Sequence, residues 1–260
     1  MSMKDVGWVW EGQGLDPGVD PSIFGVGEGC QYFGLSRAIY IFHPTTELAM
    51  RKLSWCDEVL CDISKWKWKR TDDGGCAHWV DATAESIRNE ATLVGELSTT
   101  FPNMSGAFHD DMLGLARRES VTPDEYAEVY GALKSQNPDL DLWVVVYAHE
   151  LAADEWAAFG QYMDVINLWV WEAKDLPNLD EYIDRARALF PGKPLNLGCY
   201  LRDYPTVAPV PMDMVKLQWE TLLRHLEAGT VDSYSILAAV LIEGQEEQAN
   251  WVRDFIAANS

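Results

Sequence analysis

The sequence predicts a single (β/α)₈ barrel domain that spans residues 1–260. Eight short apolar runs recur along the chain, and amphipathic segments with helix-capping residues lie between them. Strands that alternate with helices in this way are typical of a parallel sheet, and this length suits one barrel. A doubly wound open sheet would show the same alternation. No G-x-G-x-x-G pattern follows any of the runs, so the usual dinucleotide signature of that alternative is missing.

The predicted strands are continuous runs of apolar residues, as expected of strands that are buried on both faces of a sheet. They cover residues 6–10, 37–42, 58–63, 105–110, 142–148, 165–171, 195–201 and 234–242. The predicted helices cover residues 45–54, 82–101, 122–136, 178–192, 213–229 and 245–257.

Capping residues support several of these helices. Thr122, Pro123 and Glu125 form the pattern of a capping box with proline at the first helical position. Asn178 and Glu181 have the same spacing, which predicts a second cap of this kind. Gly229 stands where a C-terminal glycine cap ends the long helix that begins near residue 213.

The composition restricts the partners and the compartment. A net charge of −21 repels nucleic acid and anionic membranes, so neither is expected to bind. The five cysteines include no C-x-x-C pair, which is typical of reduced thiols in a cytoplasmic protein. No signal peptide is visible at the N-terminus, and no apolar run approaches the roughly 18 residues that span a bilayer. The sequence does not predict an oligomeric state.

Two long βα loops are predicted, at residues 11–36 and 64–80. Both would lie on the C-terminal face of the barrel, where such folds build their sites. The second loop contains KWKWKR at residues 65–70. If this segment is extended, Trp66 and Trp68 share one side and form an aromatic platform with basic neighbours, suited to an acidic or phosphorylated sugar. A solvated loop that balances nearby acids is the plainer interpretation.

Charged and aromatic side chains gather at the C-terminal ends of the predicted strands. A single one of them would only mark a strand that emerges into water, and Tyr147 and Trp169 also suit packing inside the barrel. Together they predict a site. They are Trp10, Glu11, His43, Asp62, His109, Asp110, Asp111, Tyr147, His149, Glu150, Trp169, Trp171, Glu172, Tyr200, Arg202 and Asp203.

Carboxylates beside tryptophans indicate carbohydrate chemistry. Glycoside hydrolysis needs a proton donor for the leaving oxygen and a group that stabilises the oxocarbenium-like centre. Aromatic rings stack on the C–H faces of sugars, and Trp10, Trp169, Trp171 and Tyr200 suit that role. The catalytic candidates are Asp110, Asp111, Glu172 and Asp203, and the other strand-end residues, with Trp66 and Trp68, are predicted to bind a carbohydrate substrate. This chemistry requires no cofactor and no metal.

The whole chain resembles the TIM-barrel glycosidase superfamily, with GAFHDDM at residues 106–112 in the place of the strand-four acid. The doublet is similar to the aspartate pair of β-N-acetylglucosaminidases that use substrate assistance. That resemblance implies that Asp111 is the general acid/base and that Asp110 polarises the substrate's acetamido group, which is the nucleophile. The segments LWVVVYAHEL, LWVWEAKDL and LGCYLRDY also resemble a bacterial family of uncharacterised barrel proteins.

A second assignment keeps the same class of reaction. Resemblance to the retaining glycosidases implies an acid after strand four and a protein nucleophile after a later strand, here Glu172 or Asp203. Those enzymes usually carry Asn-Glu after strand four, whereas this chain carries Asp-Asp. Both assignments predict retention of configuration.

Two other classes of function remain open. Asp62, His149, Glu150, Glu172 and Asp203 are ligand types that Mg²⁺ or Mn²⁺ accept, as in barrel isomerases and epimerases that act on sugars. No compact metal-binding spacing such as H-E-x-x-H occurs. A barrel that binds carbohydrate without catalysis is the other alternative, and activity on glycosides would distinguish it from an enzyme.

Overall fold

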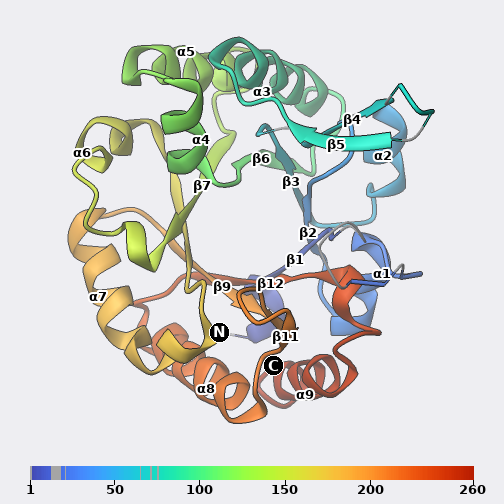
Figure 1. The fold of residues 1–260 in the computed structure, drawn as a ribbon, viewed down its shortest axis with the longest axis vertical. Helices are drawn as coiled ribbons and strands as arrows, with labels where there is room; N and C mark the ends of the chain where they lie inside the picture. Colours follow the sequence, from blue (N-terminus) through green and yellow to red (C-terminus); the bar gives the residue numbers. More distant parts are fainter. Residues whose placement is uncertain (1, 13–18, 21, 65, 71, 75) are drawn as a thin grey trace. The chain divides into compact units, whose positions relative to one another are not determined.

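Within the described part of the chain, eight parallel strands close into a barrel (Figure 1). The structure, a computed structural model, describes residues 2–12, 19–20, 22–64, 66–70, 72–74 and 76–260. This result confirms the predicted fold class. In the order of their hydrogen-bonded neighbours, the strands are β1 (Gly7–Trp10), β12 (Ser233–Leu237), β9 (Leu195–Tyr200), β8 (Val165–Trp169), β7 (Asp141–Tyr147), β6 (Met104–His109), β3 (Glu58–Asp62) and β2 (Arg37–Tyr40).

The helices follow the strands along the chain. They are α1 (Val26–Phe33), α2 (Glu47–Lys52), α3 (Ala84–Ser98), α4 (Met112–Glu119), α5 (Pro123–Lys134), α6 (Trp156–Phe159), α7 (Leu179–Leu189), α8 (Met212–Ala228) and α9 (Glu246–Ala258). Short 3₁₀ helices are η1 (Met3–Val6), η2 (Ala148–Glu150), η3 (Gly160–Tyr162), η4 (Ala173–Asn178) and η5 (Ala239–Leu241).

Two of the three predicted helix caps form as expected. The Thr122 hydroxyl accepts a hydrogen bond from the Glu125 N–H, and the Glu125 carboxylate accepts one from the Thr122 N–H. Gly229 ends α8 in the left-handed conformation, with φ of 69°. The cap predicted at Asn178 was wrong, because this residue already belongs to η4 and its side chain makes no capping bond.

The last strand is shorter than predicted. β12 ends at Leu237, and the apolar run continues as η5, whose residues Ala239 to Leu241 are all buried. The residues up to Ile242 are apolar because they are buried, although the sheet has already ended. A continuous apolar run reports burial, and it does not distinguish a strand from a buried 3₁₀ turn.

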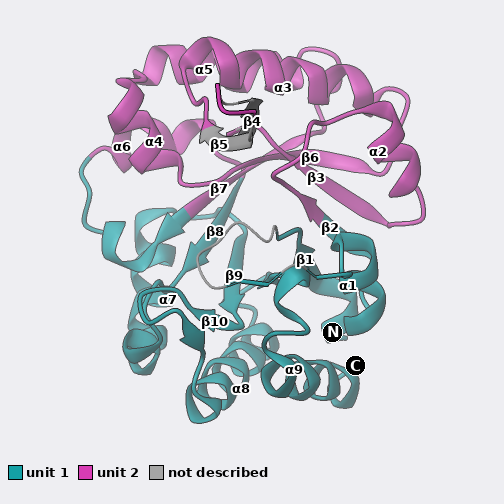
Figure 2. Ribbon diagram, turned by 45° about the vertical axis from the view of Figure 1, so that its right-hand side comes forward, with its two compact units in different colours: residues 1–38, 146–154, 165–260 teal, residues 39–145, 155–164 magenta. Residues whose placement is uncertain are grey.

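The chain divides into two compact units (Figure 2). Unit 1 comprises residues 1–38, 146–154 and 165–260, and its sheet contains β1, β12, β9 and β8. Unit 2 comprises residues 39–145 and 155–164, and it holds β3 and β6 together with helices α2 to α6. The borders at residues 38/39 and 145/146 fall inside β2 and β7.

The inner face of the unit 1 sheet carries a buried polar layer. Asn167 and Asn196 lie opposite each other in β8 and β9 and are joined by a hydrogen bond between their side chains. Ser235 of β12 bonds both of them, at 3.2 and 2.9 Å. Nearer the carboxyl ends, Gly198 leaves room for the indole of Trp169, because a Cβ at this position would overlap the ring. The register therefore positions Trp169 above the polar layer on the same face of the sheet.

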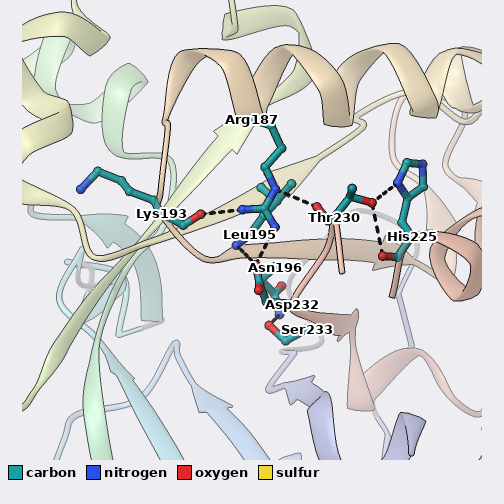
Figure 3. Close-up of polar contacts among 8 residues, drawn as sticks. All are labelled: Arg187, Lys193, Leu195, Asn196, His225, Thr230, Asp232 and Ser233. Atoms are coloured by element: carbon teal, nitrogen blue, oxygen red, sulfur yellow. Dashed lines mark hydrogen bonds and ion pairs between the residues drawn. The ribbon is translucent and has the colours of Figure 1, made fainter. Parts of the chain in front are cut away.

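Arg187 of α7 joins the amino-terminal ends of two strands in unit 1 (Figure 3). Its guanidinium donates to the carbonyl oxygens of Thr230 and Lys193, each at 2.8 Å, and pairs with Asp232 at 2.7 Å. The same Asp232 oxygen accepts the N–H of Leu195, the first residue of β9, at 2.7 Å. One side chain therefore satisfies backbone groups at the start of both β9 and β12.

The two predicted long loops contain regular structure. Residues 11–36 include α1, and residues 64–80 include an antiparallel hairpin of β4 (Trp66–Arg70) and β5 (Cys76–Val80). β4 has the extended backbone that the predicted Trp/Lys alternation requires. The side chains of Trp66 and Trp68 lie outside the described residues, so their role as a platform stays a prediction. That both segments cover the C-terminal face also stays a prediction.

Candidate functional site

An aromatic cluster occupies the carboxyl ends of β8 and β9 in unit 1. Trp169 packs against Tyr200, with ring centroids 4.4 Å apart, and the edge of Trp10 meets Trp169 at 5.2 Å. All three side chains are buried. The burial of Trp169 is what packing inside the barrel requires, and stacking of these rings on a sugar stays a prediction.

The outer part of the cluster contains Trp171, which remains 38% exposed. Its indole stacks on Tyr204 at 5.2 Å and 23°, and Tyr147 meets it edge-on at 5.7 Å. Tyr147 in turn stacks on His149 at 5.4 Å and 11°. The structure therefore brings six predicted site residues into one aromatic cluster, which also includes Tyr204. They are Trp10, Tyr147, His149, Trp169, Trp171 and Tyr200.

Tyr204 is the member of the cluster that the sequence analysis missed. It follows β10 (Arg202–Asp203), which pairs with β11 (Ala208–Pro209) in a short hairpin. The guanidinium of the buried Arg202 lies 5.5 Å from the centre of the Tyr204 ring. This hairpin returns Tyr204 to Trp171. The available signal was the tyrosine that follows two charged residues directly after a strand.

Asp203 and Glu172 of unit 1 both have hydrogen-bonding or ion-pair partners. Asp203 accepts the Ala173 N–H at 3.0 Å with one oxygen and the Thr206 hydroxyl at 2.5 Å with the other. Glu172 pairs with Lys174 at 2.6 Å. Asp203 therefore connects β10 to the start of η4, and both of its oxygens already accept hydrogen bonds.

Glu11 and Glu150 also bind backbone groups. Glu11 is buried and accepts the N–H of Val26, the first residue of α1, at 2.9 Å. This position places a carboxylate at a helix N-terminus, where it is stabilised by the exposed N–H groups. Glu150 accepts the N–H of Tyr147 at 3.2 Å. The structure thus gives each of these two predicted binding residues a role in local structure.

The aspartate doublet of unit 2 follows β6 directly. Asp110 is 8% exposed, and Asp111 is half-buried. Asp111 adopts φ of 50° and ψ of 30° and precedes α4 without a capping bond from its side chain. A left-handed conformation is uncommon for residues other than glycine, although aspartate tolerates it better than most. The alternation of a strand therefore ends before Asp111, so the two neighbouring carboxylates are not forced onto opposite faces of the sheet.

The side chain of His109 packs against α5. Its Nδ1 lies 3.0 Å from the Tyr126 hydroxyl of α5, and the two rings stack at 5.6 Å. Burial lowers the pKa of His109 to about 3, because the charged form loses its hydration. The structure places this predicted binding residue between the sheet and α5. Because successive strand residues alternate, its position directs Phe108 toward the inner face of the barrel.

Asp62 and His43 are the other predicted residues of unit 2 whose side chains the structure describes. Asp62 is buried at the end of β3, and one of its oxygens accepts the N–H and the hydroxyl of Ser64, at 2.8 and 2.6 Å. His43 is exposed and lies beside Tyr40, with ring centroids 6.0 Å apart. Asp62 therefore closes the turn after its strand.

The metal-binding alternative finds no ligand set in the described part of the chain. There, no three His, Cys, Asp or Glu side chains come close enough together to hold a metal ion. None of the described helices is long and apolar enough to span a membrane.

Comparisons with known proteins identify the fold. No family model matches the sequence, and no curated protein matches it. Among solved structures, a GH113 beta-1,4-mannanase superposes with a TM-score of 0.60 at 12% identity, over 99% of this chain and 100% of that one. A chitinase from Chromobacterium violaceum gives 0.57 at 11% identity, over 98% and 99% of the two chains. The PgaB glycoside hydrolase domain from Bordetella bronchiseptica gives 0.53 at 11% identity, over 98% and 99%. The chain therefore has the same (β/α)₈-barrel fold as these three solved glycoside hydrolases, as the resemblance of its sequence implied.

Proposed function

We propose that this protein is a glycoside hydrolase in which Asp110 and Asp111 carry the chemistry. The observation that supports this most directly is the buried Asp110 carboxylate at the end of β6, followed by Asp111 in a left-handed turn. In (β/α)₈ barrels, catalytic residues come from the carboxyl ends of strands. Solved proteins of the same fold include a mannanase and chitinases, which supports carbohydrate as the substrate class.

The two aspartates take different roles in this proposal. Asp111 is the more exposed of the pair and donates the proton to the leaving oxygen. Asp110 is buried beside it and polarises the acetamido group of the substrate. This division matches the roles implied by the resemblance to substrate-assisted β-N-acetylglucosaminidases.

The nucleophile in this proposal is the acetamido group of the substrate. Both oxygens of Asp203 accept hydrogen bonds from the Ala173 N–H and the Thr206 hydroxyl. Glu172 is engaged with Lys174. A carboxylate that must attack an anomeric carbon needs an accessible oxygen, so these partners weaken the case for either residue as a protein nucleophile. Intramolecular attack by the acetamido oxygen retains the configuration without one.

Replacing Asp111 with Asn tests the proton donor, because the shape of the side chain is kept and the proton is lost. For Asp111→Asn, we expect kcat/KM to fall by about 100-fold or more on β-N-acetylglucosaminides with poor alkyl leaving groups. On activated aryl β-N-acetylglucosaminides, which need little protonation, we expect a loss below about tenfold. The matched control is Asp139→Asn, an exposed aspartate of unit 2, which should leave both rates unchanged.

Equal losses on both kinds of substrate would contradict the role of Asp111. Equal wild-type rates on an aryl β-glucoside and an aryl β-N-acetylglucosaminide with the same leaving group would contradict substrate assistance. Activity that disappears with a chelator and returns with Mg²⁺ or Mn²⁺ would support the metal-dependent alternative instead.

A further inference from the structure

A cleft with a volume of about 240 Å³ lies beside Trp171 in unit 1. We call it the rim cleft. It is formed by His149 of η2, by residues that follow β8, and by α7. The side chains that define its chemistry are His149, Trp171, Glu172, Asp175, Tyr182 and Arg185. None of these belongs to the aspartate doublet.

One wall of the rim cleft is an aromatic surface held in place by other rings. Trp171 stacks on Tyr204 at 5.2 Å and meets Tyr147 edge-on at 5.7 Å, while 38% of its surface stays exposed. A ring that is already immobilised loses little side-chain entropy when a ligand stacks on it. The wall therefore suits a flat apolar face such as the C–H face of a pyranose ring.

The other walls offer both donors and acceptors of hydrogen bonds. Asp175 and Glu172 accept, Arg185 donates, and the Tyr182 hydroxyl does both. Arg185 lies 3.8 Å from Glu181, so its guanidinium is only loosely held. Hydroxyl groups are the ligand groups that donate and accept at once. An apolar face surrounded by hydroxyls describes a sugar residue.

The charges of the rim cleft restrict the sugar further. Two carboxylates and a chain charge of −21 repel an anionic sugar. A cationic amino sugar is repelled by Arg185 in the same cleft. Glu172 could attract it, but this carboxylate already pairs with Lys174 at 2.6 Å. A neutral sugar avoids both the repulsion by the carboxylates and the repulsion by Arg185. The lining thus argues against the acidic or phosphorylated ligand that the KWKWKR segment favours.

We propose that the rim cleft is a subsite that binds one neutral sugar residue of an oligosaccharide chain. This inference rests on the proposed function for the class of ligand, a carbohydrate. Its residues are Trp171, which stacks on the ring, and Asp175, Tyr182 and Arg185, which bind the hydroxyls.

Calorimetric titration of the purified protein tests the proposal without any need for turnover. The probes are the β-1,4-linked hexamers of glucose, mannose and N-acetylglucosamine, together with hexagalacturonate and hexaglucosamine as charged probes. We expect at least one neutral hexamer to bind, and both charged hexamers to bind at least about tenfold more weakly. Neutral hexamers that bind no better than hexagalacturonate or hexaglucosamine, or that do not bind at all, would overturn the inference.

Matched variants locate the binding. Trp171→Ala should weaken the binding of the neutral hexamer by about tenfold or more. Trp55 is a comparably exposed tryptophan of unit 2, and Trp55→Ala should leave this binding unchanged. Asp175→Asn should narrow the preference for neutral over anionic hexamers, and Asp184→Asn, exposed on α7 outside the cleft, should leave it unchanged. The Asp175 comparison reports charge selectivity, which a purely structural role would not alter. Equal effects in the paired variants would contradict the assignment of the cleft.

The result also separates the two proposals. Binding with this selectivity and no hydrolysis of any glycoside would end the proposed hydrolase function and leave the subsite standing. Hydrolysis of aryl glycosides without binding of any hexamer would end the subsite and leave the hydrolase function standing.

Discussion

His109 illustrates how the direction of one side chain decides its chemistry. The sequence places it beside Asp110, which suggested a role in binding substrate. The structure directs its ring to Tyr126 of α5, and burial there keeps the imidazole neutral by lowering its pKa to about 3. A pattern of apolar residues shows that a strand is buried, but it does not show which neighbour each side chain meets. The burial of His109 therefore affects stability, and its role in binding substrate stays a prediction.

The lowered pKa of His109 predicts a pH-dependent stability. The unfolded chain binds a proton at this residue below its ordinary pKa of 6.5, whereas the folded chain does so only near pH 3. The free energy of unfolding therefore falls as the pH drops from 6.5 towards 3, since protons favour the unfolded state. Between pH 7.5 and pH 5, the contribution of His109 amounts to about 2 kcal/mol.

Urea unfolding at these two pH values measures this contribution. The pH dependence should be smaller by that amount in His109→Asn, which removes the titrating group. His149→Asn is the matched control, because His149 is exposed, and it should keep the full dependence of the wild type. An unchanged dependence in His109→Asn would mean that another group is responsible.

At the scale of elements, the Arg187 network joins α7 to the starts of β9 and β12. Lysine keeps the charge but cannot reach both carbonyl oxygens and Asp232 at once. We expect Arg187→Lys to lower the free energy of unfolding by about 2–4 kcal/mol, since hydrogen bonds that involve a charged group are each worth about 1.5–3 kcal/mol. The shift of the urea midpoint measures this loss.

Arg253→Lys provides the comparison for Arg187. Arg253 pairs with its sequence neighbour Asp254 on α9, at the surface of the protein. Such a pair contributes little, so the substitution should change the free energy of unfolding by less than about 0.5 kcal/mol. Similar losses in the two variants would show that Arg187 acts only through its charge.

The elements differ in how far the sequence predicts them. The capping box of Thr122 and Glu125 was predictable because both partners lie within one helical turn. The partners of Asp203 were not, because Ala173 belongs to a different βα segment and only the fold brings it close. For the same reason, the strand ends predicted which carboxylates to consider, but not that Glu11 and Asp203 are bound to backbone N–H groups.

At the scale of the whole molecule, the borders between the compact units predict cooperative unfolding. Because these borders cut through β2 and β7, each of these two strands has residues in both units. We therefore expect a single unfolding transition by calorimetry and by fluorescence, in agreement with the single domain predicted from the sequence. Limited proteolysis should release no stable fragment that corresponds to either unit.

Two separated transitions, or a protease-resistant fragment near residues 39–145, would contradict this expectation. Destabilising unit 1 alone with Arg187→Lys sharpens the test. In a single cooperative domain, this variant shifts every optical signal together, including signals that come from tryptophans of unit 2 such as Trp55.

The pairing of β1 with β12 also has a consequence for biosynthesis. Gly7 pairs in register with Tyr234 in the parallel ladder, so β1 acquires this partner strand only after the strands that lie between them in the sequence have been made. Most of unit 2, in contrast, emerges as the continuous stretch of residues 39–145. Non-local pairing of this kind is slow and leaves a strand edge open in the meantime. Until β12 is made, the nascent chain therefore presents an edge of the apolar β1 to other chains, and chaperones that shield strand edges should matter most for this strand.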